Sequence, residues 1–485
     1  MMPPETFETA SVQSGARRRF LLFAGLSLLI YALLWVLYTV PALAENRPLR
    51  EVILWVSIAT LLASYAASYK ALKSGEIPAL WVVGSSVLLA VMALMIPPFH
   101  STDVFGYINR GWQQLQYGMN PYIHTVDHIP HWEQDPMITD HWVNNPSPYG
   151  FLYLLVAKAL TALGGGSKAA TMMVFKSFNL VAHLATAALI WLGVRRLHPN
   201  SGHGPALRAV HLYAWNPLML IHSLSNGHND ILMGFLVTTG AFFAIIGSWL
   251  WILPALVGAT LIKYGALVII PFALLFLFKQ RAWAAILGGL ILGVLVFLGT
   301  GAPFLGDWRQ FHFKQIERNA FVSHGSLHSV IYSLYKTIGK ELIYPLYEAK
   351  ELARSILKNL LLGIYAIFYG WLAVKRLRQP AYALRDWLTD ALLVMAVMVC
   401  LISLKFYPWY LGMFFPLAFY LEEGHWLRRF MIVLSGTQML ALTFIGQSHF
   451  INFILMTGLA LAWLVVDLRR PAQKAPASTE LQAVS

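Results

Sequence analysis

The sequence contains only one cysteine and few charged residues. Cys400 lies inside an apolar run, so no intrachain disulfide can form, and a disulfide-rich secreted domain is excluded. Charged residues make up 12% of the 485 residues, whereas soluble domains contain about 25%. Hydrophobic residues make up 58%, and the mean hydropathy is +0.60. This composition predicts an integral protein that crosses a bilayer several times.

Several motifs of nucleotide-binding and hydrolytic enzymes are also missing. There is no Walker motif, no dinucleotide-binding glycine pattern and no nucleophile elbow. The glycine triplet 164–166 is interpreted as a turn, because neither a preceding strand nor a Lys-Ser/Thr pair accompanies it. No clear repeat of half the chain occurs, which disfavours a transporter built from inverted repeats.

The formal net charge of +13 could indicate a nucleic-acid partner, but the basic residues do not form one block. They lie in short clusters between apolar runs, as expected for cytoplasmic loops under the positive-inside rule. We therefore expect the lipid bilayer, and no nucleic acid, as a partner. The clusters are 17–19, Lys70 with Lys73, 195–196, Lys279 with Arg281, 375–378, 428–429 and 469–470.

The apolar runs predict an all-α, polytopic membrane protein with roughly twelve to fourteen transmembrane helices. One domain, 16–470, is expected between short disordered cytoplasmic tails at 1–15 and 471–485. The first run is interpreted as an uncleaved helix, because it is longer than the core of a usual signal peptide. The longer runs lie near 20–42, 51–69, 77–98, 168–194, 206–223, 229–249, 282–301, 356–374, 385–404, 427–446 and 450–468, and shorter ones at 251–264, 266–279 and 408–421.

Two local choices place every basic cluster on the cytoplasmic side. Residues 148–163 are short for a span, and we predict a re-entrant or interfacial helix there. Residues 251–279 are predicted to form two short helices that meet at Lys263 near the outer face. The large polar loops 99–147 and 302–355 then lie outside the cytoplasm, which indicates one working face.

Asp103 follows an apolar run directly, at the predicted membrane surface. A carboxylate in such low-dielectric surroundings could act as a general base. Alternatively, Ser101, Thr102 or Asp103 caps a short helix that starts near Val104. The two roles are compatible.

The segment 222–233 opens an otherwise apolar helix with three polar residues, His228, Asn229 and Asp230. Polar groups at membrane depth are costly and usually face a cavity or a partner. The competing interpretation is that Asn226, Asn229 or Asp230 caps the helix.

Three cations lie on the predicted outer side: Lys263, Arg318 and Lys405. Lysine and arginine are the natural partners of phosphate, and the aromatic run after Lys405 suits a sugar face or a prenyl chain. A lone lysine such as Lys263 could instead extend its ammonium group towards the membrane surface. On one face together, the three predict an anionic headgroup near the membrane.

The loop 124–142 contains four histidines and four acids, which raises the question of a metal site. No tight ligand spacing such as H-E-x-x-H occurs. Histidine, tryptophan and proline together are typical of an interfacial loop. We therefore expect neither a metal nor another cofactor.

Six short blocks resemble, in the same order, those of the GT-C superfamily of membrane glycosyltransferases. They are most similar to bacterial polyprenol-phosphate-mannose-dependent α-mannosyltransferases, and the match covers most of the chain, from about residue 85 to 420. Each block alone is weak, whereas the ordered set is fairly specific for the superfamily. The blocks are Asp-Val-x-x-Tyr at 103–107, Gly118-x-Asn120-Pro121-Tyr122, Trp215-Asn216-Pro217, Gly227-His228-Asn229-Asp230, Lys263-Tyr264 and Tyr407-Pro408-Trp409-Tyr410.

The resemblance implies transfer of a hexose, with mannose expected, from a polyprenyl-phosphate-sugar donor to a glycan or lipid-linked acceptor. The reaction inverts the anomeric carbon on the extracytoplasmic face of a bacterial plasma membrane. Asp103 matches the first-loop acid that serves as general base, and Lys263 and Lys405 lie in blocks that would hold the donor phosphate. Arg318 is added by its charge and side. Sugar or acceptor contacts are expected from Tyr107, Asn120, Tyr122, His228, Asn229, Asp230, Tyr407, Trp409 and Tyr410.

The competing hypothesis is a transporter or flippase of lipid-linked saccharides, which could use the same cations and aromatics without a base. A protein that only binds or scaffolds such glycans is a third hypothesis. Asp103 discriminates among them, because only the transferase needs its carboxylate for turnover.

Overall fold

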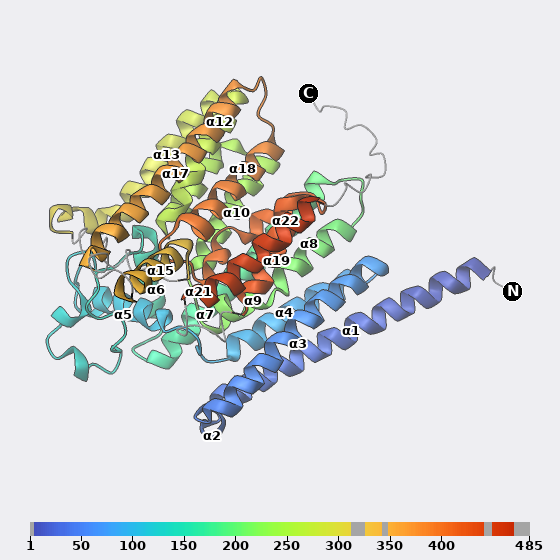
Figure 1. Ribbon diagram of the computed structural model, residues 1–485, viewed down its shortest axis with the longest axis horizontal. Coiled ribbons are helices and arrows are strands. Elements are labelled where there is room, and N and C mark those ends of the chain that lie inside the picture. Colours follow the sequence, from blue (N-terminus) through green and yellow to red (C-terminus); the bar gives the residue numbers. More distant parts are fainter. Residues whose placement is uncertain (1–3, 312–324, 342–347, 441–448, 470–485) are drawn as a thin grey trace.

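The computed structural model describes residues 4–311, 325–341, 348–440 and 449–469, and these residues form helices and no β-strand (Figure 1). The prediction of an all-α polytopic protein is confirmed. The helices are α1 (Pro4–Thr39), α2 (Pro41–Ala44), α3 (Arg47–Ser74), α4 (Ala79–Met95), α5 (Asp103–Gln116), α6 (Phe151–Leu163), α7 (Lys168–Leu197), α8 (Gly204–Ala214), α9 (Pro217–Met219), α10 (Asp230–Ile245), α11 (Ile252–Thr260), α12 (Ile270–Lys279), α13 (Trp283–Leu305), α15 (Leu327–Glu341), α17 (Lys350–Arg378), α18 (Leu384–Val397), α19 (Trp426–Gln438), α21 (His449–Phe453) and α22 (Leu459–Arg469).

Within the described residues, six helices are long and apolar enough to cross a bilayer. A pair bent by 120°, Pro217–Ser225 with Asp230–Ile245, could supply a seventh span. Shorter apolar helices, including α4 and α6, add to these. The number of spans, expected to be twelve to fourteen, stays a prediction. The six are Gln13–Thr39, Arg47–Ser74, Lys168–Leu197, Trp283–Leu305, Lys350–Arg378 and Ile451–Arg469.

α1 begins at Pro4 and therefore includes residues 4–15. The short disordered cytoplasmic tails at 1–15 and 471–485 stay predictions. Proline is well tolerated in the first turn of a helix, and no further proline or glycine interrupts the chain before Gly15. Residues 471–485 lie outside the described residues.

The predicted break at Lys263 is present. α11 ends at Thr260, Lys263 is extended with φ −143° and ψ 133°, and a 3₁₀ turn, Tyr264–Ile269, leads into α12. α6 has 13 residues and is therefore only about 20 Å long, less than the hydrocarbon thickness of about 30 Å. This length agrees with a re-entrant helix, whose depth in the bilayer remains a prediction.

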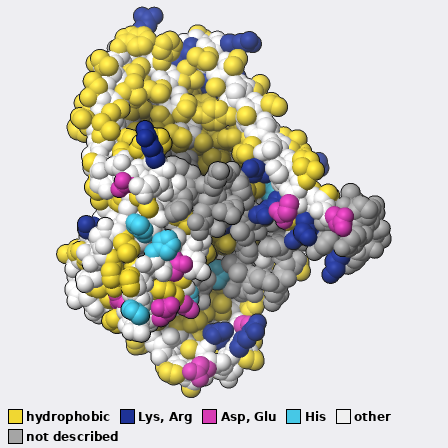
Figure 2. Space-filling view, turned by 90° about the vertical axis from the view of Figure 1, so that its left-hand side faces the viewer, with side chains coloured by type: hydrophobic (Ala, Val, Ile, Leu, Met, Phe, Trp, Pro, Cys, Tyr) yellow, Lys and Arg dark blue, Asp and Glu magenta, His cyan; other side chains and the backbone are white. Residues whose placement is uncertain are grey.

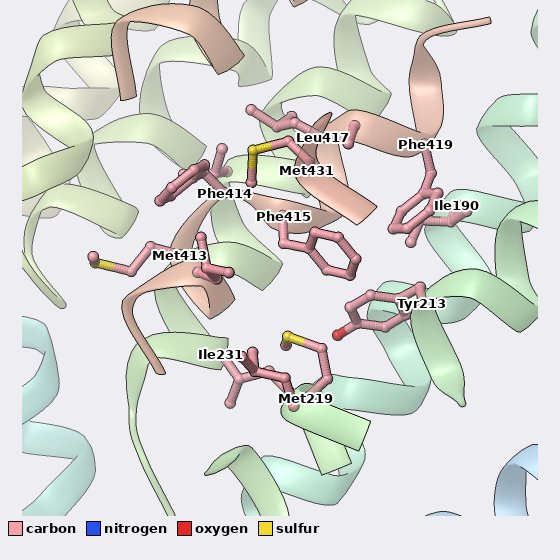
Figure 3. Packing of buried hydrophobic residues seen from close by; sticks show 14 of the residues in the cluster. Ile190, Tyr213, Met219, Ile231, Met413, Phe414, Phe415, Leu417, Phe419 and Met431 are labelled. Carbon is pink, nitrogen blue, oxygen red and sulfur yellow. The ribbon is translucent and has the colours of Figure 1, made fainter. Parts of the chain in front are cut away.

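A buried apolar layer supports the polar turn that precedes α10. Figure 3 shows Met219, Ile231, Met413 and Phe415 gathered within this layer, from α9, α10 and the 3₁₀ turns Pro408–Met413 and Phe415–Tyr420. A Cβ added at Gly234 would lie 2.0 Å from the carbonyl oxygen of Gly412. Because α10 and the turn at 408–413 touch backbone to backbone, the first turn of α10 is fixed next to that aromatic turn.

The polar loop between α5 and α6 folds back on α5. Its small core consists of Val126, Ile129, Ile138 and Val143. Asn109 of α5 donates to the carbonyls of Thr139 and His141 and so ties the loop to the helix. In Figure 2, hydrophobic side chains cover the upper part of one face, while histidine and acidic side chains gather below.

Candidate active site

Asp103 is the first residue of α5 and does not cap it with its side chain. The N-cap is Thr102, without a side-chain cap, and the backbone N–H of Asp103 donates to Oγ of Ser101. The carboxylate remains favourably placed at the positive end of the helix dipole. Its side chain is 19% exposed, so it is partly buried yet reachable. The proposed capping by the Asp103 side chain is therefore not seen, and the carboxylate is available for other contacts.

His228 is the immediate neighbour of Asp103. Nδ1 of His228 lies 3.4 Å from Oδ2 of Asp103, at ion-pair distance but outside hydrogen-bond geometry. The fully buried imidazole stacks on Trp409 with 4.0 Å between ring centroids, and Trp409 stacks on Tyr407 at 4.5 Å. This stack of three rings fixes the imidazole beside the carboxylate.

Lys263 forms a partly buried ion pair instead of simply extending towards the membrane surface. Its Nζ lies 2.8 Å from Oδ1 of Asp230, which is 1% exposed, while the lysine side chain is 17% exposed. The ammonium also lies over the rings of Tyr410 and Tyr149, at 5.1 and 5.9 Å from their centroids. The pair joins the break after α11 to the start of α10.

Asp103 interacts electrostatically with Lys263 and Lys405, the two predicted cations that lie within the described residues. Burial raises the pKa of the Asp103 carboxyl, but His228, Lys263 and Arg110 together outweigh this effect and hold the pKa below its usual value. Burial lowers the pKa of the Lys405 ammonium, and the negative charge of Asp103 partly offsets that effect. Arg318 lies outside the described residues.

Tyr107 and Asn229 form a further contact of the site. The Tyr107 hydroxyl donates to Oδ1 of Asn229 over 3.3 Å, and the Tyr107 ring packs edge-to-face on Tyr149. Nδ2 of Asn229 and Oδ2 of Asp230 are buried without a hydrogen-bond partner. Buried polar atoms normally find partners, so these two atoms are candidates for ligand contacts.

Asn120 and Tyr122 support the loop and are less directly connected to Asp103. Nδ2 of Asn120 donates to the carbonyl of Phe304, and its Oδ1 accepts from the backbone N–H of Tyr122. The Tyr122 hydroxyl donates to the carbonyl of Tyr149 over 2.5 Å, and its ring stacks on Phe311. These contacts stabilise the loop next to Tyr149.

The turn before α10 is held from two sides. Oδ1 of Asn226 accepts from the backbone N–H groups of Phe99 and His100, so it does not cap its own helix. Asn179 of α7 donates to the carbonyls of Ser223 and His228. Gly227 has φ +74°, and a Cβ there would lie 3.1 Å from Cγ2 of Val104. This turn therefore needs glycine both for its backbone and for its contact with α5.

Three further residues of the site have no role in the sequence-based prediction. Arg110 is buried and donates to the carbonyls of Gly106 and Asn145. His222 is 1% exposed in the π-helical turn Leu220–Ser225, with its ring centroid 5.9 Å from that of His228. Of the three, Asn179 could have been predicted from the sequence, because a polar residue inside an apolar helix is costly unless it has a partner.

Trp215-Asn216-Pro217 has a structural role. Oδ1 of Asn216 accepts from the backbone N–H groups of Leu218 and Met219, and its Nδ2 donates to Oγ of Ser435. Asn216 is therefore the N-cap of α9. Among the described residues, no group of three or more histidine, cysteine or acidic side chains is arranged to hold a metal ion.

Fold and site together define a polytopic helical membrane protein with a partly exposed carboxylate, two nearby cations and a wall of aromatic rings. Residues 19–279, just over half of the chain, match the family described as alpha-(1→6)-mannopyranosyltransferase, N-terminal domain. The chain therefore belongs to this family of GT-C mannosyltransferases, which confirms the resemblance seen in the motifs.

Curated relatives carry the same name. An alpha-(1→6)-mannopyranosyltransferase A from Mycobacterium tuberculosis is 26% identical over 224 residues, 46% of this chain and 42% of the relative. One from Corynebacterium glutamicum is 26% identical over 187 residues, 38% and 36% of the two chains. The matched regions thus span less than half of these relatives. No solved structure shows a significant match to the chain.

Proposed function

We propose that this protein is a membrane mannosyltransferase that moves mannose from a polyprenyl-phosphate donor to a hydroxyl of a glycan or lipid-linked acceptor. The reaction takes place on the extracytoplasmic face and inverts the anomeric carbon. The names of the relatives support mannose as the sugar and suggest an α-(1→6) linkage. The family membership supports transfer over the alternative of a lipid-linked-saccharide flippase.

The observation that carries this proposal is the position of Asp103. Its carboxylate is partly exposed at the start of α5, beside His228. Both Lys263 and Lys405 act on it electrostatically. An inverting transfer needs a base and a cationic phosphate site close together but on opposite sides of the reacting carbon. We infer that Asp103 would serve as the base and that Lys263 and Lys405 would form the cationic phosphate site.

In the proposed transfer, the residues of the site account for both the proton that is released and the charge that develops. The acceptor hydroxyl gives its proton to a carboxylate oxygen of Asp103 while its oxygen forms a bond to the anomeric carbon. The bond from that carbon to the donor phosphate breaks, and its electron pair stays on the phosphate oxygen. Lys263 and Lys405, and by its charge Arg318, would stabilise the phosphate as this negative charge develops.

The aromatic and amide groups would orient the sugar. Trp409 and Tyr407 form a stacked wall next to His228. Nδ2 of Asn229 and Oδ2 of Asp230 offer a donor and an acceptor without protein partners. Sugar hydroxyls both donate and accept, so this pair suits one face of a hexose. Asn120 and Tyr122 would contribute by holding the loop in place.

Replacement of Asp103 by asparagine tests the proposal. Asparagine keeps the size of the side chain but cannot accept the proton, so transfer should fall by about 10²- to 10⁴-fold while donor binding persists. The assay uses purified protein with polyprenyl-phosphate mannose and, in parallel, the glucose and arabinose analogues.

Asp140→Asn is the matched control, because the Asp140 side chain is 81% exposed in the loop and its ion pair is with the neighbouring His141. Near-normal transfer by Asp103→Asn would refute Asp103 as the base, whereas absence of transfer by the wild-type protein would favour the flippase. Transfer of glucose or arabinose in preference to mannose would refute the proposed sugar.

A further inference from the structure

A groove of about 670 Å³ opens between two turns of the chain, far from Asp103. One turn joins α10 to α11 and the other joins α12 to α13. α10 begins at Asp230 and has 16 residues, so its far end lies about 24 Å from the ion pair with Lys263. The groove is lined chiefly by Trp249, Trp251, Gln280, Arg281 and Trp283.

Arg281 is the only charged side chain among the residues that line the groove. It is exposed, and within the described part of the chain no carboxylate pairs with it. Lys279, two residues earlier, is instead engaged by the carbonyls of Leu377 and Gln379. The groove therefore presents one cation that no carboxylate of the described residues neutralises.

The backbone of Arg281 is strained for an arginine. Its φ is +56°, in the left-handed region that favours glycine. Glycine would adopt this turn more easily, so the turn itself does not require an arginine. The positive-inside rule accounts for a basic residue at this predicted cytoplasmic end, and the place of Arg281 in the lining of the groove is what bears on a ligand.

Apart from Ser248 and Gln280, the other side chains that line the groove are apolar, and exposed apolar residues continue from it along α13. Trp251 and Trp283 are 48% and 57% exposed, and Leu287 and Ile291 of α13 are 65% and 52% exposed. Only 17% of the most apolar stretch of α13 is buried in the protein. Tryptophan prefers the boundary between lipid and water, so we expect the groove at the depth where a lipid headgroup meets its acyl chains.

We propose that this groove binds one anionic phospholipid, with its phosphate on Arg281 and its acyl chains along α13. The single unneutralised cation favours an anionic over a zwitterionic headgroup, because the lining contains no carboxylate to attract a choline or ethanolamine. Basic grooves at one membrane face commonly hold such headgroups. The distance along α10 separates this lipid from the donor proposed at Lys263.

Arg281→Gly is the decisive variant, because it removes the cation and relieves the backbone strain. Purified full-length protein in mild detergent is titrated with short-chain phosphatidylglycerol, and bound lipid is counted by native mass spectrometry. We expect about fivefold weaker binding for Arg281→Gly, the effect of one cation near an anionic lipid. Thermal unfolding checks the fold, and phosphatidylglycerol should raise the midpoint of the wild type more than that of the variant.

Arg378→Gln is the matched control, since Arg378 is exposed at the end of α17 and does not line the groove. It should bind phosphatidylglycerol as the wild type does. Equal losses in both variants would overturn the proposal, because they would show a non-specific charge effect. Equal binding of phosphatidylcholine, or tighter binding of a short polyprenyl phosphate, would overturn the assigned ligand.

Discussion

Asp103 combines ionisation with access. Burial alone would favour the neutral acid, but the surrounding positive and polar groups hold its pKa below the usual value. The carboxylate therefore stays charged at neutral pH while part of it remains exposed to an incoming hydroxyl. A base with a low pKa is a weak one, so the proposed transfer depends on the cations that stabilise the leaving phosphate.

His228→Phe should move the acid limb of the pH profile to higher pH. Phenylalanine keeps a ring against Trp409 but removes Nδ1, which lies 3.4 Å from the carboxylate. His228 makes the largest contribution that lowers the pKa of Asp103, and the variant loses it. The pKa therefore rises, because burial raises it and is now counteracted less. A base works only when deprotonated, so transfer at mildly acidic pH falls earlier than in the wild type.

The measurement is kcat/KM for transfer across the pH range in which the protein stays folded. His128→Phe is the control, because His128 is exposed in the loop between α5 and α6. Its profile should match the wild type. An unshifted acid limb for His228→Phe would show that His228 does not set the ionisation of Asp103.

Substitutions at Lys263 and Asp230 should affect the stability of the protein and its affinity for the donor differently. Lys263→Ala leaves Asp230 charged and 1% exposed without its partner, which should destabilise the protein by about 3–5 kcal/mol. Adding Asp230→Asn removes the unpaired charge and should restore much of that loss. Donor affinity should remain weak in both, because the phosphate has lost the same ammonium.

Thermal unfolding in detergent and donor binding, measured on the two single variants and the double variant, complete this cycle. Asp230→Asn alone should lose less stability than Lys263→Ala, because the Lys263 side chain is 17% exposed and keeps contact with water. Wild-type donor affinity in Lys263→Ala would remove Lys263 from the phosphate site.

At the scale of elements, the turn between the π-helical segment and α10 does most to assemble the site. It carries His228, Asn229 and Asp230 on consecutive residues, and Asn226 ties it to the chain just before α5. Small shifts of this turn would move the imidazole, the unpaired amide and the lysine partner together. The geometry of this turn, rather than its composition, therefore brings these three groups of the candidate site together.

Gly227→Ala should lower transfer through misplacement of this turn. A non-glycine residue at φ +74° costs about 1–2 kcal/mol, and the added Cβ presses on Val104 beside Asp103. A shift of this kind should reduce kcat/KM by roughly 10- to 100-fold. Gly202→Ala is the control: its φ is +60°, and nothing lies within 4 Å of the added Cβ. Equal activity of the two variants would contradict the role of the turn.

Much of this candidate site could be predicted from the sequence. Charged residues at the ends of apolar helices are energetically costly, so they indicate candidate functional residues. Asp103, Asp230 and Lys263 were proposed in this way, and the structure brings them together. Their pairing was not: Lys263 meets an acid 33 positions away in the chain, and that contact depends on the 120° bend before α10. Arg110 was missed because nothing in the polar sequence of α5 indicates which face the following loop buries.

At the scale of the whole molecule, the basic clusters lie at the ends of the helices that are far from Asp103. Asn179 of α7 contacts the site, and Arg195 lies sixteen residues further along the same helix, about 24 Å away. Lys279 lies at the far end of α12 and binds carbonyls at the end of α17, beside the basic residues 375–378. The positive-inside rule predicts that these basic ends lie in the cytoplasm, which would put Asp103 on the opposite face, as proposed above.

Single-cysteine labelling tests this orientation. Cys400 is buried, so Cys400→Ala provides a background without the only native thiol. His128→Cys, exposed in the loop after α5, should react with a membrane-impermeant maleimide in intact cells. Ser201→Cys, exposed in the turn beside Arg195, should react only after permeabilisation. The reverse pattern would place Asp103 on the cytoplasmic side and refute an extracytoplasmic transfer, because the base and its acceptor must share one face.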